Sequence, residues 1–252
     1  MEKEFLRVCE NGNLARVKEL LNKGVDPSIK NNHAIREASY NGHTKIVKLL
    51  LADPRVDASA SDNHAIRWAS AEGRTEIVRL LLQDKRVDPS ADDNYPIKLA
   101  SRIGYTKIVK MLLADPRVDP STKNNYAIRW ASYNGHTEIV KLLLQDPRVD
   151  PSAIDNYAIR WASKNDHTEI VRLLLADPRV NSSANDNRAI RWASENGHTK
   201  IVKLLIDWYI EKKKLFRLVN DLRKDKETGD KLAQQDPRFA KYWNVQKSSF
   251  LI

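Results

Sequence analysis

A repeat of fixed length constrains this chain more than any other feature. Close copies of the stretch NNYAIRWASYNGHTEIVKLLLQDPRVDPSAI, residues 124–154, recur along most of the sequence. They begin at Asn31, Asp62, Asp93, Asn124, Asp155 and Asp186. Each start lies 31 residues after the previous one, without insertion or deletion. A constant period of this length indicates an array of stacked structural repeats.

Each unit is predicted to contain two short helices and a loop. Residues 127–133 follow helical spacing, and the Asn-Gly pair that comes next ends the helix, because glycine tolerates the left-handed conformation at a helix C-terminus. We expect Thr137 to cap a second helix that runs through Gln145, because Pro147 excludes helical geometry in the residue before it. Residues 148–154 lack a helical period and are predicted to form a loop.

The second helix is apolar over most of its circumference and must therefore be covered on several sides. The residues of the central unit that we expect in the core are Ile128, Ala131, Ile139, Val140, Leu142 and Leu143. One unit is too small to cover such a helix, so neighbouring units must stack and share a continuous core. The predicted fold class is all-α.

The order of helix, Asn-Gly-His and an apolar helix ending in Leu-Leu-Leu resembles the ankyrin repeat. Residues 10–28, ENGNLARVKELLNKGVDPS, are similar to the opening of ankyrin arrays, and Pro96 retains the proline of the family's Thr-Pro-Leu-His motif. The resemblance covers about residues 1–206 and implies an ankyrin solenoid whose first helices line a concave groove for partner proteins. The unit is two residues shorter than the family's usual length of about 33. Its Asp-Pro-Arg-Val-Asp-Pro-Ser variant resembles ankyrin arrays of giant DNA viruses of amoebae.

We expect three parts: an N-terminal capping ankyrin repeat in residues 1–30, six ankyrin repeats in residues 31–206, and a helical C-terminal cap or tail in residues 207–252. Arg16 and Glu19 give the first part a polar side where later copies are apolar, as the end of an array requires.

The tail departs from the repeat at Asp207-Trp208, where the second helix is expected to extend or restart as an amphipathic helix. Glu227-Thr228-Gly229-Asp230 is predicted to be a turn. One more short helix is expected within residues 231–252, with the apolar side Phe239, Tyr242 and Trp243. The tail either covers the end of the array or forms a separate docking segment for a partner.

Composition limits the class of protein. Hydrophobic residues make up 41% of the chain, enough for a core, yet no apolar run approaches the roughly 18 residues of a membrane span. The charged N-terminus lacks the apolar segment of a signal peptide. The single cysteine, Cys9, excludes an internal disulfide and fits a reducing compartment. We therefore expect an intracellular, monomeric protein of the cytoplasm or nucleus.

Tryptophan recurs at one position of the first helix, in Trp68, Trp130, Trp161 and Trp192. Trp130 lies about 200° around the helix from the core residue Ile128, and Tyr133 shares its side. The ankyrin resemblance implies that this side lines the groove, and tryptophan is a frequent anchor of protein interfaces. The alternative is that each indole packs against the neighbouring repeat and seals the stack.

A row of cations precedes these tryptophans, in Arg67, Arg129, Arg160 and Arg191. They either pair with the Asp and Asn residues that open each unit or bind an acidic ligand through forked hydrogen bonds. A second arginine series lies in the Asp-Pro-Arg loops and is expected to form a solvated, weakly paired surface.

No catalytic or metal-binding constellation emerges. The histidines recur at positions set by the repeat rather than at the short spacing of zinc ligands. Ser, His and Asp do not converge as in a catalytic triad, and no glycine-rich phosphate loop occurs. We therefore expect no enzyme activity, no cofactor and no metal.

Two functions follow as hypotheses. The first is a protein-interaction scaffold that binds an extended or acidic segment of a partner protein along the tryptophan and arginine series. The alternative is nucleic-acid binding, suggested by a net charge of +10. The tail holds 11 Lys and Arg against 7 Asp and Glu, so the charge is distributed along the chain. No nucleic-acid motif appears, and a salt titration of any binding would distinguish the two.

Overall fold

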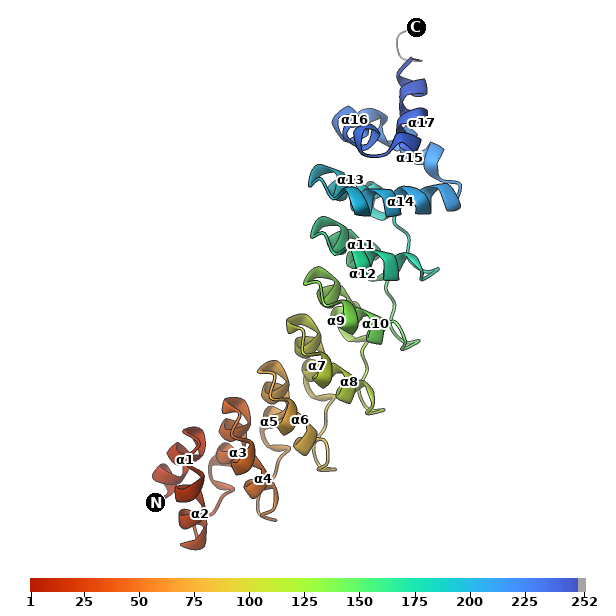
Figure 1. The fold of residues 1–252 in the computed structure, drawn as a ribbon. Coiled ribbons are helices and arrows are strands. Elements are labelled where there is room, and N and C mark those ends of the chain that lie inside the picture. Colours follow the sequence, from red (N-terminus) through yellow and green to blue (C-terminus); the bar gives the residue numbers. More distant parts are fainter. Residues whose placement is uncertain (249–252) are drawn as a thin grey trace. The chain divides into compact units, whose positions relative to one another are not determined.

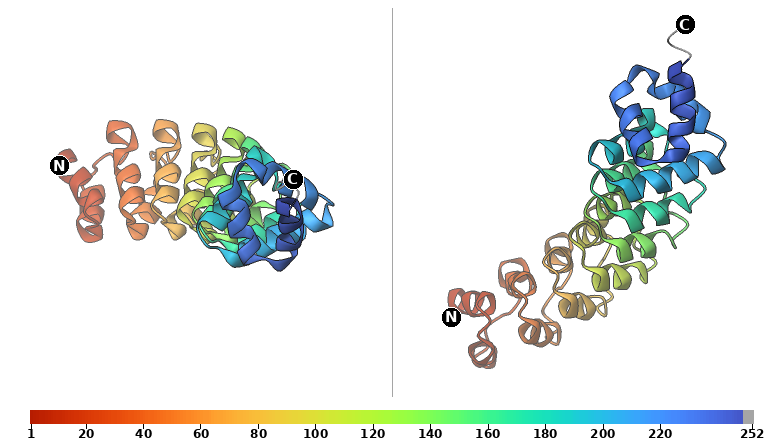
Figure 2. Two further views of the ribbon diagram at one scale, coloured as in Figure 1. Left: turned by 90° about the horizontal axis from the view of Figure 1, so that it is seen from above. Right: turned by 45° about the horizontal axis from the view of Figure 1, so that its top comes forward.

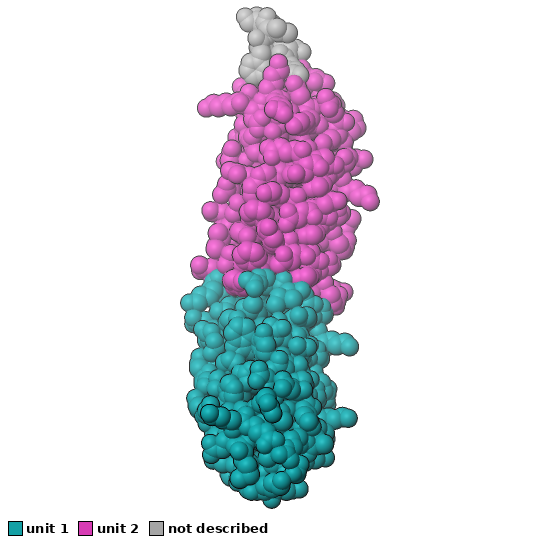
Figure 3. All heavy atoms as spheres, turned by 90° about the vertical axis from the view of Figure 1, so that its left-hand side faces the viewer, with its two compact units in different colours: residues 1–123 teal, residues 124–252 magenta. Residues whose placement is uncertain are grey.

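The computed structural model is all-helical and describes residues 1–248, with side chains for residues 1–244 (Figures 1 and 2). The chain forms two compact units, Met1–Lys123 and Asn124–Ile252 (Figure 3). Each unit is a stack of antiparallel helix pairs, so the predicted all-α array with C-terminal helices is confirmed.

Unit 1 contains four helix pairs, whose first helices form one layer and whose second helices form another (Figure 1). The first helices are α1 (Glu2–Glu10), α3 (Ile29–Asn41), α5 (Ala60–Ala71) and α7 (Ala91–Ile103). The second helices are α2 (Leu14–Asn22), α4 (Thr44–Leu51), α6 (Thr75–Leu81) and α8 (Thr106–Leu113). The core lies between the layers and consists of the aliphatic residues that recur in each copy.

Unit 2 repeats this arrangement and ends in additional helices. Its first helices are α9 (Thr122–Tyr133, which begins in the last residues of unit 1), α11 (Ala153–Lys164) and α13 (Ala184–Glu195). Its second helices are α10 (Thr137–Leu143), α12 (Thr168–Leu175) and α14 (Thr199–Glu211). The tail adds α15 (Leu215–Asp221), the short 3-10 helix η1 (Leu222–Lys224), α16 (Lys226–Gln235) and α17 (Pro237–Ser248).

Three details of the predicted central unit are corrected. The second helix is preceded by His136 at its N-cap, and Thr137 is its first helical residue. The helix ends at Leu143, with Leu144 at the C-cap, so it is shorter than predicted. Of the expected core residues, all but Leu142 are fully buried; Leu142 is half-buried at the edge of the helix.

A left-handed turn opens each first helix from α3 onward. Three consecutive residues have positive φ, and the third is always an asparagine, as in Asn156 (φ 58, ψ 44). Asparagine tolerates this conformation better than most residues. Its buried side-chain carbonyl accepts a hydrogen bond from a backbone N–H in the next loop; for Asn156 the donor is Asn181 N, at 2.7 Å. Asn63 and Asn125 bond Asp88 N and Asp150 N in the same way, so this residue joins successive repeats.

The Asn-Gly-His segment joins repeats at another point. The His167 ring lies over Gly135, where an added Cβ would come within 2.7 Å of the ring, and its Nε2 lies 3.0 Å from the Tyr133 carbonyl. His198 makes the same bond to the Lys164 carbonyl. The glycine is therefore required both by its positive φ and by the imidazole that the next repeat places against it.

The arginines of the Asp-Pro-Arg loops correct the expectation of a weakly paired surface. Arg179 donates from Nε and Nη2 to the two carboxylate oxygens of Asp177, at 2.9 and 2.6 Å, and from Nη1 to the Val149 carbonyl at 2.8 Å. Arg86 and Arg117 bond the preceding repeat in the same manner. Although these side chains are 42–47% exposed, they connect adjacent loops.

These loops predict a specific acid sensitivity. Hydrogen bonds from the loop arginines lower the pKa of the carboxylates of Asp53, Asp84, Asp115, Asp146 and Asp177. Since a depressed folded pKa means that the unfolded chain binds more protons, this stabilisation is complete above about pH 4 and is lost as the pH falls through the folded values. We expect the urea midpoint to fall steeply below pH 4. The slope should be shallower in Asp84→Asn/Asp115→Asn; an unchanged slope would contradict this origin.

The tail packs against the last repeat through bonds that replace those of a following repeat. Asn187 accepts a hydrogen bond from the buried Tyr209 hydroxyl at 2.6 Å and donates one to Asp221 at 3.0 Å. Arg191 pairs with Asp225, and Gln235 donates to the Ser194 carbonyl. Helix α14 extends beyond the repeat as predicted, and α15–α17 cover the end of α13 and α14 (Figure 1).

The predicted turn at Glu227–Asp230 is wrong. These residues lie inside α16, where Thr228 and Gly229 are buried. Gly229 allows close contact with the Trp243 ring of α17, whose indole N–H donates to Asp230 at 2.8 Å. The glycine therefore marks close helix packing rather than a turn. The short helix expected within residues 231–252 is α17, in which Phe239 and Trp243 are buried and Tyr242 is 46% exposed. Residues 249–252 of the predicted range lie outside the described part of the chain.

Candidate functional site

The repeated tryptophans lie on the first helices, half-buried, and contact aromatic rings of neighbouring repeats. Trp68 belongs to α5 in unit 1, whereas Trp130, Trp161 and Trp192 belong to α9, α11 and α13 in unit 2. Each of these side chains therefore packs against a neighbouring repeat and also remains partly exposed to solvent.

In unit 2 the rings form a connected series, which we call the aromatic surface: Tyr126, Trp130, Tyr133, Tyr157, Trp161 and Trp192. Tyr133 lies between Trp130 and Trp161, with centroid distances of 5.3 and 5.1 Å. Trp161 and Trp192 are 4.9 Å apart. Tyr126 and Tyr157 join from the start of their helices, at 5.7 Å from Trp130 and 5.6 Å from Trp161. Such tilted contacts stabilise the stack and leave a partly exposed apolar surface.

Unit 1 holds a smaller cluster around Trp68. Its indole contacts Tyr40, His64 and Tyr95 at centroid distances of 5.9, 5.9 and 6.0 Å. Burial, together with the nearby charges of Arg36 and Arg67, lowers the pKa of His64 to about 4. The imidazole is therefore neutral at physiological pH. The neighbouring copies carry Glu37 and Leu99 at the tryptophan position, so the unit 1 cluster does not continue as in unit 2.

Cations lie over the rings of the aromatic surface. Lys164 Nζ is 4.6 Å from the Trp161 centroid and 5.0 Å from that of Trp192. The Arg129 guanidinium lies 5.2 Å from the Tyr157 centroid, and that of Arg188 lies 5.2 Å from Trp192. The surface is therefore both aromatic and positively charged, a combination that favours an acidic ligand with apolar groups.

The arginines of the predicted ladder bond the left-handed turns. Arg129, Arg160 and Arg191 each donate from Nε to the carbonyl of the turn's second residue, at 2.8, 2.8 and 2.9 Å. Arg67 donates from Nη1 to the equivalent Asp62 carbonyl at 3.1 Å and also pairs with the carboxylates of Asp62 at 3.2 Å and of Asp92 in the next repeat at 2.9 Å. Of the two alternatives that the sequence left open, the structure shows bonds to the opening Asp and Asn residues, largely through their backbone carbonyls; binding of an acidic ligand stays a hypothesis.

Several members of the surface were not among the sequence candidates. Tyr126, Tyr157 and Arg188 directly precede the Ala-Ile-Arg-Trp run of their copies, and Lys164 lies at a position whose residue type varies between copies. Most copies carry His or Tyr at the position of Tyr126, and this recurrence could have identified Tyr126 and Tyr157 from the sequence. For Lys164 no signal existed, because its contact with two indoles depends on the packing of adjacent helices.

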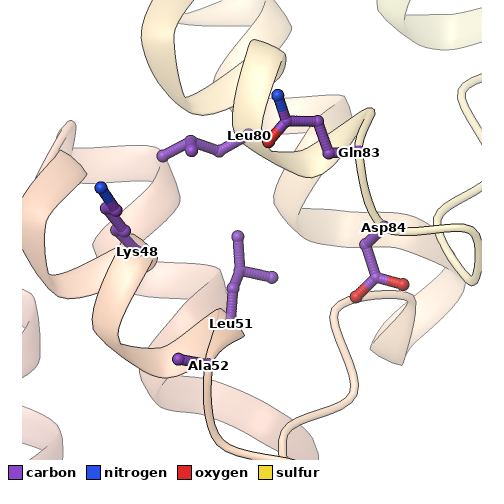
Figure 4. Close-up of a pocket in the computed structure, with 6 residues that line it drawn as sticks. All are labelled: Lys48, Leu51, Ala52, Leu80, Gln83 and Asp84. Carbon is purple, nitrogen blue, oxygen red and sulfur yellow. The ribbon is translucent and has the colours of Figure 1, made fainter.

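A shallow pocket of about 340 Å³ lies elsewhere, between the second helices α4 and α6 (Figure 4). It is lined by Lys48, Leu51, Ala52, Leu80, Gln83 and Asp84. The Asp84 carboxylate in its lining accepts a hydrogen bond from Arg86 Nη2 at 2.6 Å. Within the described residues, no cluster of three or more His, Cys, Asp or Glu side chains could hold a metal ion, and no helix is long and apolar enough to cross a membrane.

Comparison with known protein families agrees with this architecture. The family model of ankyrin repeats (three copies) matches residues 5–93, 69–155 and 128–215. These overlapping matches cover most of the sequence, so the chain belongs to the ankyrin-repeat family. No curated protein matches it significantly. Ankyrin repeats are in general protein-binding scaffolds and are usually not enzymes.

Proposed function

We propose that this protein is a non-enzymatic interaction module that binds a segment of a partner protein along its first helices. In unit 2 the contact residues are Trp130, Tyr133, Trp161 and Trp192, flanked by Arg129, Arg160 and Arg191. Trp68 and Arg67 form the corresponding contact in unit 1. The observation that carries the proposal is the connected, partly exposed aromatic surface with cations over its rings.

The charge of the surface supports a partner segment that is acidic and extended. Carboxylates would meet Lys164 and Arg188, while apolar side chains would lie on the indole rings. The single cysteine is buried, which fits a reducing intracellular compartment. A viral origin, suggested by the Asp-Pro-Arg-Val-Asp-Pro-Ser motif of the repeats, stays a prediction.

Replacing Trp130 and Trp161 by alanine is expected to abolish partner capture while most of the helicity remains. Two anchors of an interface commonly contribute about 2 kcal/mol or more each, which together amount to a loss of roughly a thousandfold in affinity. The measurement is quantitative affinity capture from cells, with circular dichroism of the purified variant.

The matched control is Lys141→Ala, which changes an exposed residue of the second helix α10. Proteins that bind the wild type and Lys141→Ala but not the tryptophan variant are partners of the aromatic surface. An identical set of captured proteins on all three would rule the proposal out. Loss of helicity in the tryptophan variant would instead assign both rings to packing alone.

A further inference from the structure

Three cations surround the contact between Trp161 in α11 and Trp192 in α13. Lys164 of α11 lies over both indoles, and Arg188 of α13 lies over the Trp192 ring. Burial lowers the pKa of Arg160 in α11, and the nearby charge of Arg188 lowers it further. The two guanidinium groups are therefore close enough to repel each other. We call Arg160, Lys164 and Arg188 the cation cluster.

In the part of the chain whose side chains are described, no carboxylate forms an ion pair with the cation cluster. Asp155 attracts Arg160, but from beyond ion-pair distance. The Asp186 carboxylate of α13 pairs with Arg191 instead, at 3.6 Å. Cations that repel one another and have no paired acid are unfavourable in a folded protein, so the cluster is suited to bind an anion from outside the chain.

Arg160 is held in place by the backbone and keeps one donor group for a ligand. Its Nε donates to the Asp155 carbonyl at 2.8 Å, and its Nη2 donates to the Ile154 carbonyl at 3.0 Å. Within residues 1–244, its Nη1 donates to no acceptor. The residue is only 8% exposed, so its charge is largely desolvated. A fixed and desolvated guanidinium loses little side-chain entropy when it binds an oxyanion.

The cluster replaces aromatic residues of the preceding repeat. In α9, Tyr126 and Tyr133 place their rings beside Trp130, at centroid distances of 5.7 and 5.3 Å. The residue equivalent to Tyr133 in α11 is Lys164, and the residue equivalent to Tyr126 in α13 is Arg188. The positive charge is therefore concentrated at one place on the aromatic surface rather than repeated in every copy.

We propose that the cation cluster binds the phosphate group of a phosphorylated residue in the partner's segment. This inference rests on the proposed function and names the chemistry of the segment's anchoring residue. A phosphate monoester carries a charge of about −1.5 to −2 at pH 7 and three strong acceptor oxygens, so one group can neutralise and bond several cations at once. A carboxylate has a single charge. Clusters of arginine are a recurring means of recognising phosphorylated segments.

The charges around the cluster favour a single phosphate over a nucleic acid strand. Asp155 and Asp186 are exposed at the start of α11 and α13, and Asp225 of the tail pairs with Arg191. A polyanion that followed the row of first helices would meet these carboxylates one after another and be repelled by them. A phosphorylated peptide needs to place only one anionic group at the cluster.

The probe is a degenerate library of short peptides on beads, each with a phosphoserine at the centre. Two matched libraries carry serine or glutamate at that position. Retention of the full chain should be about tenfold greater on the phosphoserine library than on either control, because the controls lack the charge-assisted bonds of a dianion. Equal retention on the phosphoserine and glutamate libraries overturns the proposal. Displacement by single-stranded DNA at a phosphate concentration below that of the library would assign the cluster to nucleic acid and overturn it too.

Two substitutions locate the site. Arg188→Tyr introduces the residue that the equivalent positions of α9 and α11 carry, so the stack of repeats should be retained, and Lys164→Gln removes the second accessible cation. Each should lower retention on the phosphoserine library about tenfold and leave retention on the serine library unchanged.

The matched control is Arg172→Gln, which removes the same single charge from the second helix α12. Arg172 is 58% exposed and pairs with Glu169, so this variant should stay within about twofold of the wild type. An equal loss in all three variants would mean that net charge alone causes retention, and the proposal would be wrong. Full retention of Arg188→Tyr and Lys164→Gln, with wild-type helicity in circular dichroism, would contradict it as well.

The experiment distinguishes this inference from the proposed function. If capture of partners from cells is lost in Trp130→Ala/Trp161→Ala but the chain does not prefer the phosphoserine library, the proposed function stands and this inference fails. If library binding depends on Arg188 and Lys164 while the tryptophan variant captures the same proteins as the wild type, the cation cluster stands and the aromatic surface is overturned.

Discussion

Replacing Asn156 by alanine is expected to destabilise the protein by about 2–5 kcal/mol. The buried amide of Asn156 accepts a hydrogen bond from Asn181 N at 2.7 Å, and loss of such a partner costs about 1–3 kcal/mol. The residue also has φ 58, where alanine pays roughly 1–2 kcal/mol more than asparagine or glycine. The measurement is the free energy of unfolding from urea titration.

Asn156→Gly separates the two contributions. The glycine variant loses the hydrogen bond, but glycine adopts the left-handed conformation freely. The free energy of unfolding should therefore fall by about 1–2 kcal/mol less in Asn156→Gly than in Asn156→Ala. Equal destabilisation by the two substitutions would show that the backbone conformation contributes nothing. Wild-type stability of both would show that the bond between repeats does not stabilise the stack.

The second large effect is expected at Gly229 in α16. In an ordinary exposed helix, Gly→Ala stabilises by about 1 kcal/mol. At Gly229 an added Cβ would overlap the six-membered ring of Trp243, so Gly229→Ala should instead destabilise by about 2–3 kcal/mol. Thermal unfolding measures the loss, and limited proteolysis should show earlier cleavage in the tail.

A second substitution tests this steric cause. Trp243→Leu makes room beside residue 229, so the combined Gly229→Ala/Trp243→Leu variant should be more stable than the sum of the two single losses indicates. Additive losses would mean that the two residues do not act on each other. A stabilised Gly229→Ala variant would mean that α16 and α17 are farther apart than described.

The local patterns of the sequence were sufficient for the helix pairs of the repeats and most of the core. Ile128, Ile139, Val140 and Leu143 are buried as predicted, because helical spacing and apolarity together define a face that must be covered. Leu142 was misassigned, since an apolar residue at the edge of such a face is covered only if a neighbour reaches it. Gly229 was misread as a turn because a glycine required by packing looks the same in sequence as a glycine required by a bend.

For the candidate site, the pattern identified the repeated tryptophans and arginines but not their partners. The sequence shows that Arg129 and Arg67 occupy equivalent positions. It does not show that Asp92 contacts Arg67, because this contact joins residues 25 positions apart in different repeats. Whether the indoles are exposed or packed was equally open, and the structure shows that they are both.

By itself, the sequence determined that the chain is an array of helix pairs. Units of a constant 31-residue period, each with one helix that is apolar over most of its circumference, can cover that helix only by stacking on their neighbours. Only the tertiary structure decided what the polar side chains do. The roles of Asn156, Arg179 and His167 depend on backbone groups that the adjacent repeat brings within hydrogen-bonding distance, and that distance is set by packing rather than by local sequence.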